Sequence, residues 1–132
     1  MPTLMKRWFH KLRSWYKTIW PAIIWSAFVL ILLIIPLESK TKESFFSIPH
    51  FDKAIHFILF MILSFLWKQY LESKSKSIRT GILGIVILSI SYGVLIEYIQ
   101  QYTGREFDPA DMLANTLGIL CGVIIKKSRI KY

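Results

Sequence analysis

Four long apolar runs, separated by short charged stretches, constrain the fold of this 132-residue chain more than any other feature. The hydrocarbon core of a bilayer is about 30 Å thick, so a spanning helix needs roughly 20 apolar residues. Two runs are shorter than that, but four such runs leave too little polar surface to cover them in a soluble protein. We therefore predict an all-α membrane protein with four transmembrane helices. The runs cover residues 18–37, 54–67, 80–96 and 112–125.

The net charge of +9 is distributed unevenly across these runs, and the asymmetry predicts a topology. One membrane face receives 13 basic residues and one acidic residue, net +12, whereas the other receives four basic and seven acidic residues, net −3. Because basic segments stay in the cytoplasm, both termini are predicted to be cytoplasmic. This asymmetry accounts for the basic excess by itself, so we predict no nucleic-acid partner.

The basic leader, residues 1–18, is predicted to be an amphipathic helix on the cytoplasmic membrane surface. Apolar and aromatic residues recur there at spacings of three and four, while lysines and arginines fill the opposite face. A membrane anchor with an aromatic belt and a lipid-sensing helix are both consistent with this pattern. The predicted organisation is thus an interfacial helix at 1–18, a four-helix transmembrane domain at 19–126 and a basic cytoplasmic tail at 127–132.

Gly118 and Gly122 are spaced so that a neighbouring helix could approach the fourth run closely. Another span of the same chain is the simplest neighbour, and a second copy is the alternative, so the oligomeric state stays open. Cys121 is the lone cysteine, which excludes a disulfide within one chain.

Polar and charged residues gather at the outer ends of the last three predicted spans. Spanning the hydrocarbon would draw several of them into it, where ionisable groups are costly unless paired or hydrated and usually mark functional sites. Alternatively, Lys53 and Arg105 simply neutralise neighbouring carboxylates while the helix ends lie among headgroups. The candidate ligand-binding residues are Asp52, Lys53, His56, Glu97, Gln100, Arg105, Asp108, Asp111 and Asn115.

Glu97 and Arg105 are predicted to act as a pair at the centre of this site. Glu97 interrupts the third span, and Gly104, which adopts positive φ without steric cost, would turn the chain back so that Arg105 approaches it. Asp108 and Asp111 offer Arg105 alternative partners.

The order of these motifs resembles the VanZ-like family of small bacterial membrane proteins. The matching elements are DKxxH at 52–56, ExxQ at 97–100, Arg105 followed by Asp108 and Asp111, and then Asn115 and Gly118. The resemblance covers about residues 20–125 and implies a multi-pass protein of the bacterial cytoplasmic membrane. The founding member of the family confers low-level resistance to the glycopeptide teicoplanin, so the resemblance implies a role at the cell envelope without specifying a reaction.

Three classes of function could use this site. In a binding module, Arg105 would clamp a phosphate or carboxylate group. In an enzyme, the catalytic candidates are His56, Glu97 and Asp111, with a carboxylate as general base and His56 as its acid partner, although no nucleophile motif supports this. A transporter is disfavoured, because the inner halves of the second and fourth spans contain almost nothing that could carry an ion.

We therefore predict a membrane protein that binds an envelope component at the outer face, with modification of that component as an alternative. Its predicted partners are membrane lipids and a lipid-linked or peptidoglycan precursor or a glycopeptide. A metal is conceivable through His56, Glu97, Asp108 and Asp111, but a single imidazole is a sparse ligand set. The sequence therefore predicts no metal and no cofactor.

Overall fold

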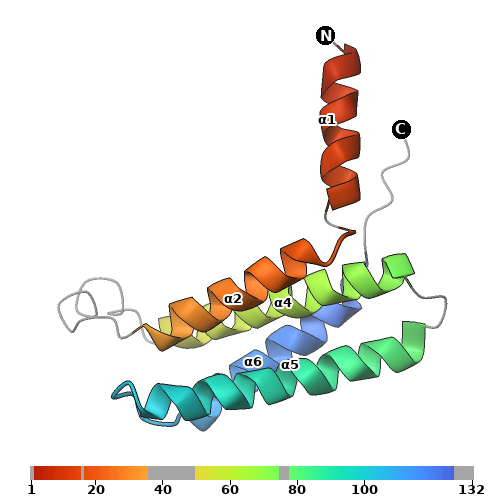
Figure 1. The fold of residues 1–132 in the computed structure, drawn as a ribbon. Coiled ribbons are helices and arrows are strands. Elements are labelled where there is room, and N and C mark those ends of the chain that lie inside the picture. Colours follow the sequence, from red (N-terminus) through yellow and green to blue (C-terminus); the bar gives the residue numbers. More distant parts are fainter. Residues whose placement is uncertain (1, 16, 36–49, 75–77, 127–132) are drawn as a thin grey trace.

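The chain folds into helices that pack as a bundle with one projecting arm. The structure, a computed structural model, describes residues 2–15, 17–35, 50–74 and 78–126, and this part of the chain contains five helices and no strand. Four helices pack against one another, and α1 projects crosswise from one end of the bundle (Figure 1). The helices are α1 (Pro2–Trp15), α2 (Trp20–Ile34), α4 (Phe51–Lys74), α5 (Ile78–Gln101) and α6 (Pro109–Ile124).

Two helices are long and apolar enough to cross a membrane, namely α4 and the stretch Arg79–Gln101 of α5. The other two bundle helices are shorter, with 15 residues in α2 and 16 in α6. At 1.5 Å per residue they reach about 22 and 24 Å, less than the roughly 30 Å of hydrocarbon. The all-helical class is confirmed for the described residues, whereas four spans and cytoplasmic termini stay predictions.

The observed helix ends differ from the predicted apolar runs for local reasons. α4 extends beyond the run 54–67 because polar residues continue it at both ends, with Asp52 in its first turn and Lys74 in its last, as the helix dipole favours. α2 ends before residue 37 because Ile35 precedes a proline, which disfavours helical backbone, and Ile35 is extended with ψ 121°.

The predicted leader helix is present as α1, but its apolar side chains are exposed rather than packed on the bundle. Its connection to the bundle includes a hydrogen bond from Ser73 Oγ to the Lys17 carbonyl, at 3.0 Å. A helix that exposes Trp8 and Phe9 has a face available for a membrane surface. The placement of α1 on a membrane surface stays a prediction, as do the predicted domain boundaries at residues 18 and 126. The predicted tail at 127–132 lies outside the described residues.

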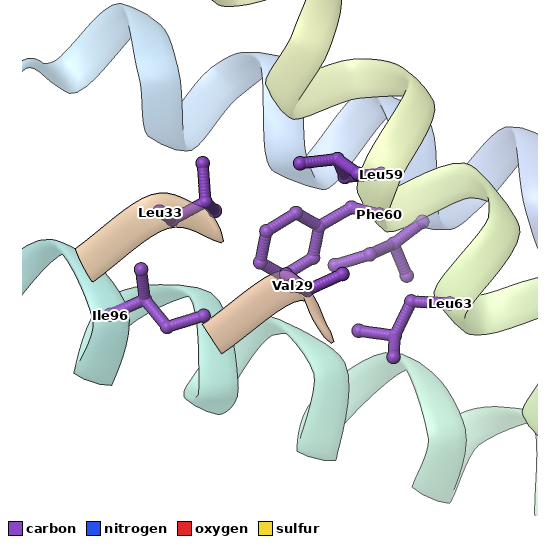
Figure 2. Close-up of a cluster of buried hydrophobic side chains, with 7 residues drawn as sticks. Val29, Leu33, Leu59, Phe60, Leu63 and Ile96 are labelled. Atoms are coloured by element: carbon purple, nitrogen blue, oxygen red, sulfur yellow. The ribbon is translucent and has the colours of Figure 1, made fainter. Parts of the chain in front are cut away.

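The bundle is apolar on the outside as well as in its core. All four bundle helices contribute to one hydrophobic cluster, which Figure 2 shows. Large apolar side chains also point outward, as at Leu88 and Ile124, each 72% exposed. Extensive exposed apolar surface is expected of a lipid-facing helix and is unusual for a soluble monomer. The cluster consists of Val29, Leu33, Leu59, Phe60, Leu63, Ile96 and Ile119.

Gly118 and Gly122 lie where α6 packs on α4. A Cβ atom added to Gly118 would collide with the Phe57 carbonyl, and one added to Gly122 would collide with the Met61 carbonyl. Only glycine allows the two backbones to approach this closely. The prediction that these glycines face another helix of the same chain is therefore confirmed.

Candidate functional site

The N-terminal turns of α4 and α6 and the C-terminal turns of α5 meet at the end of the bundle away from α1 (Figure 1). The predicted site residues come from these turns and from the α5–α6 connection. They form two layers, one buried between the helices and one partly exposed above it.

The deep layer consists of His56, Glu97, Asp111 and Asn115, each at most 3% exposed. His56 Nδ1 lies 3.0 Å from Asn115 Oδ1, and because an amide oxygen only accepts, Nδ1 is the donor of this hydrogen bond. The same nitrogen lies 3.8 Å from Glu97 Oε1, and His56 Nε2 lies 3.7 Å from Asp111 Oδ2. An imidazole from α4 is therefore enclosed by carboxylates from α5 and α6.

Several polar atoms of the deep layer have no hydrogen-bond partner among the described residues. They are His56 Nε2, Glu97 Oε1 and Asn115 Nδ2. A buried polar atom without a partner costs about 1–3 kcal/mol, and more when it carries charge. Helix capping and core packing do not require such atoms. These donor and acceptor atoms are therefore available for hydrogen bonds or coordination to a ligand.

The upper layer is organised around Lys53. Its Nζ atom lies 2.8 Å from Asp108, 3.2 Å from Asp52 and 3.4 Å from Asp111. The guanidinium of Arg105 approaches the same Asp111, with 3.9 Å between Nη2 and Oδ2. Asp111 therefore belongs to both layers, because its Oδ1 faces Lys53 while its Oδ2 lies near both Arg105 and His56.

Asp108 also begins α6. Its Oδ1 accepts a hydrogen bond from the Ala110 backbone N–H at 2.8 Å, with Pro109 as the next residue, which is the usual geometry of a helix N-cap. The hydrogen bond from Lys53, followed by that from Ala110, holds the pKa of Asp108 below its usual value. Asp108 thus links α6 to α4 through its ion pair with Lys53, and it also caps the N-terminus of α6.

The predicted pairing of Glu97 with Arg105 differs from the structure. Gly104 does turn the chain with φ of 82°, as predicted, but Arg105 then approaches Asp111, while Glu97 lies beside His56. Glu97 is four residues inside the end of α5, about 6 Å below it, and is fully buried there. Asp111, in the first turn of α6, lies at the level of the connection that carries Arg105.

Two residues shape the surroundings of the site, Gln100 through a hydrogen bond and Gly93 because it has no side chain. The side-chain amide of Gln100 donates to the Leu33 carbonyl at 2.8 Å, which ties α5 to the end of α2. Gly93, which was not among the predicted site residues, lies beside Asn115, and an added Cβ would come within 3.3 Å of Asn115 Nδ2. Its position one helical turn before Glu97 is the signal that could have identified it.

Within the described residues, these features define a helical bundle with two helices long and apolar enough to span a membrane, an apolar exterior and a buried polar cluster at one end. The family model described as VanZ/LLP1 matches residues 3–130, and the chain belongs to this family. The resemblance inferred from the motif order is thereby confirmed. Neither a curated protein nor a solved structure matches the chain.

Proposed function

We propose that this VanZ/LLP1 protein binds the anionic headgroup of a cell-envelope component at the outer face of the bacterial cytoplasmic membrane. The observation that carries the proposal is the stacking of the two layers. Unpartnered, buried polar atoms of His56, Glu97 and Asn115 lie at the end of the bundle where Arg105 is partly exposed. An anionic ligand could therefore bind the guanidinium of Arg105 at the surface and contact the polar atoms of the deep layer beneath it.

Arg105 is the residue best suited to contact an anion. Its side chain is 30% exposed, and its ion pair with Asp111 is long, at 3.9 Å. A guanidinium carries five N–H donors and binds phosphate or carboxylate through two of them at once. Lys53, by contrast, is already surrounded by three aspartates. We assign headgroup recognition to Arg105 and the support of the site to Lys53.

The membrane arrangement that we propose has four spans and cytoplasmic termini. It rests on the charge asymmetry of the sequence, on the two long apolar helices and on the apolar exterior of α2 and α6. The short helices then require local thinning of the bilayer or headgroups that enter the polar end. In this arrangement the site faces outward, where lipid-linked and wall precursors and glycopeptides are found.

A matched pair of variants tests headgroup binding. Purified protein in nanodiscs is exposed to a short-chain polyprenyl phosphate and, separately, to a zwitterionic lipid, and bound lipid is counted by native mass spectrometry. We expect Arg105→Gln to weaken binding of the phosphate lipid roughly 10- to 100-fold, because a charge-assisted hydrogen bond is lost. Arg79→Gln, an exposed arginine at the start of α5, is the control and should bind as the unmodified protein does. Equal binding by both variants would refute the assignment.

An acid–base enzyme is the second candidate, because His56 lies within 4 Å of both Glu97 and Asp111. Mass spectrometry of lipids and wall precursors from cells with and without the protein separates the two functions. A covalent change that disappears with Glu97→Gln would favour the enzyme, whereas unchanged structures would favour binding. Teicoplanin susceptibility of the same strains tests the resistance that kinship implies.

A further inference from the structure

Three buried ionisable side chains from three different helices converge in the deep layer. We propose that His56 of α4, Glu97 of α5 and Asp111 of α6 bind one divalent metal ion. One potential ligand atom from each residue lies within 4.8 Å of the other two. Ligands bonded at 2.0–2.2 Å in a tetrahedral site lie about 3.4 Å apart, so side-chain rotations that bring the three atoms closer together would complete the site.

The hydrogen bonding of His56 is that of a metal ligand. Its Nδ1–H donates to Asn115 Oδ1, which leaves the lone pair on Nε2, and Nε2 has no partner in the described part of the chain. Metal-binding histidines almost always donate their other ring N–H to a carbonyl or carboxylate, which fixes the tautomer. Glu97 Oε1 is likewise buried and without a hydrogen bond. Two of the three proposed ligands thus present an unused acceptor atom.

The charge of the two layers together favours a divalent cation. With all four carboxylates ionised and the imidazole neutral, these groups and the two permanent cations sum to a net charge of −2. Excess charge in an apolar environment is costly unless a counterion compensates it. One divalent ion would bring the cluster to neutrality. The carboxylates are Asp52, Glu97, Asp108 and Asp111, and the cations are Lys53 and Arg105.

The ligand types indicate the class of metal. Mg²⁺ and Ca²⁺ prefer oxygen ligands alone, whereas an imidazole with two carboxylates suits Zn²⁺ or Mn²⁺. Three protein ligands leave coordination positions for water or for an oxygen of a bound anion. The sequence predicts no metal, because a single imidazole is a sparse ligand set. The structure adds the proximity of three ligand side chains from three helices, which the linear order of the residues does not show.

Metal binding by the unmodified protein is the direct test. Full-length protein is purified in detergent through a tag without histidines, stripped with a chelator and titrated with Zn²⁺ or Mn²⁺ by calorimetry. We expect one ion per chain by elemental mass spectrometry, and a rise in Tm of several degrees at about a hundredfold excess over Kd. Absence of saturable binding of both ions would overturn the proposal. In that case protonation of both His56 ring nitrogens, seen by ¹⁵N NMR, would identify protons as the compensating charge.

Matched variants locate the ion. His56→Gln, Glu97→Gln and Asp111→Asn should each lower affinity roughly a hundredfold or more, since loss even of an outer-sphere partner costs 10- to 100-fold. Glu106→Gln removes an exposed carboxylate next to Arg105 and should retain one ion per chain. Equal losses in all four variants would refute the assignment. Metal binding is measured without the proposed headgroup, so the two proposals can fail separately. An Arg105→Gln variant that loses lipid binding but still binds one metal ion per chain would show that the two sites are independent.

Discussion

The two ends of the bundle both bury ionisable side chains, but the ends differ in whether the polar atoms of these side chains have partners. At the end near α1, the buried ammonium of Lys68 donates to the Ile125 carbonyl at 2.9 Å and lies 3.6 Å from Glu72. At the other end, His56 and Glu97 are buried with unpartnered atoms. The partners of Lys68 are complete, and they connect α4 to the C-cap residue of α6. Buried ionisable groups whose polar atoms lack partners lower the stability of the fold, so their presence at the other end favours a role in binding.

The contrast concerns clusters of ionisable groups rather than polarity in general. Gln69, close to Lys68, also has a buried side-chain nitrogen without a partner. A neutral amide in that position costs less than a carboxylate, and it is one isolated group. The deep layer instead brings an imidazole, two carboxylates and an amide together, and this combination distinguishes the two ends.

Labelling of engineered cysteines should give an all-or-none difference between the two ends in intact cells. In a Cys121→Ser background, Tyr102→Cys should react with a membrane-impermeant maleimide, and Lys74→Cys should react only after the cells are opened. Both positions are exposed. Tyr102 directly follows α5 at the end of the bundle that carries the polar site, and Lys74 is the last residue of α4 at the opposite end of the bundle. The reverse pattern would place the polar site in the cytoplasm and remove the proposed outer ligand.

Both ends depend on the close packing of α4 and α6, so Gly118→Leu should have a large effect on stability. The new side chain would collide with backbone rather than with a flexible side chain, and overpacking of this kind costs about 3 kcal/mol or more. Gly84→Leu is the control, because nothing lies within 4 Å of a Cβ added there. Similar thermal unfolding of the two variants in detergent would mean that α6 can shift away from α4.

Removing one ionisable side chain at each end should change the free energy of unfolding differently. Lys68→Met should destabilise the protein by about 1–3 kcal/mol, because the Ile125 carbonyl loses its donor and Glu72 its counterion. In metal-free protein, Glu97→Gln should be neutral or slightly stabilising, because the carboxylate it replaces has an unpartnered atom. Chemical denaturation in detergent measures both. Strong destabilisation by Glu97→Gln would mean that this end, too, is built for stability.

The smallest expected effect concerns the partner of Arg105. A double-mutant cycle for Arg105→Gln with Asp111→Asn should show coupling of about 0.5–1 kcal/mol, since the pair is long and partly exposed to screening. The corresponding cycle with Glu97→Gln should be additive within about 0.3 kcal/mol. Coupling to Glu97 instead would restore the pairing predicted from the sequence.

The helical class, the family and the turn at Gly104 could be predicted because each depends on a local or strongly repeated signal. Apolar runs predict helices wherever they lie, and positive φ at Gly104 follows from one residue type in one connection. The packing of Gly118 and Gly122 on α4 was predictable for a similar reason, since their spacing places both on one helix face.

The layering of the site could not be predicted, because it depends on depth and on the direction of side chains. Sequence spacing brought Glu97 and Arg105 near the same helix end, but it did not show that Glu97 is covered by His56 while Arg105 remains at the surface. Nor did it show that Gln100 bonds to the Leu33 carbonyl. These outcomes follow from how α2 and α4 pack against α5, which no local pattern records.

The position of Lys53 and His56 on α4 also has a consequence for biogenesis. Chains are synthesised from the N-terminus, so in the proposed membrane arrangement these two residues would enter the bilayer before Glu97 on α5 and Asp111 on α6. If the helices insert in that order, each carboxylate reaches the lipid when a basic or hydrogen-bonding group is already in place to receive it. A rearranged gene that encoded α5 and α6 ahead of α4 would expose both acids to hydrocarbon alone, and its product should fail at the translocon rather than in the finished fold.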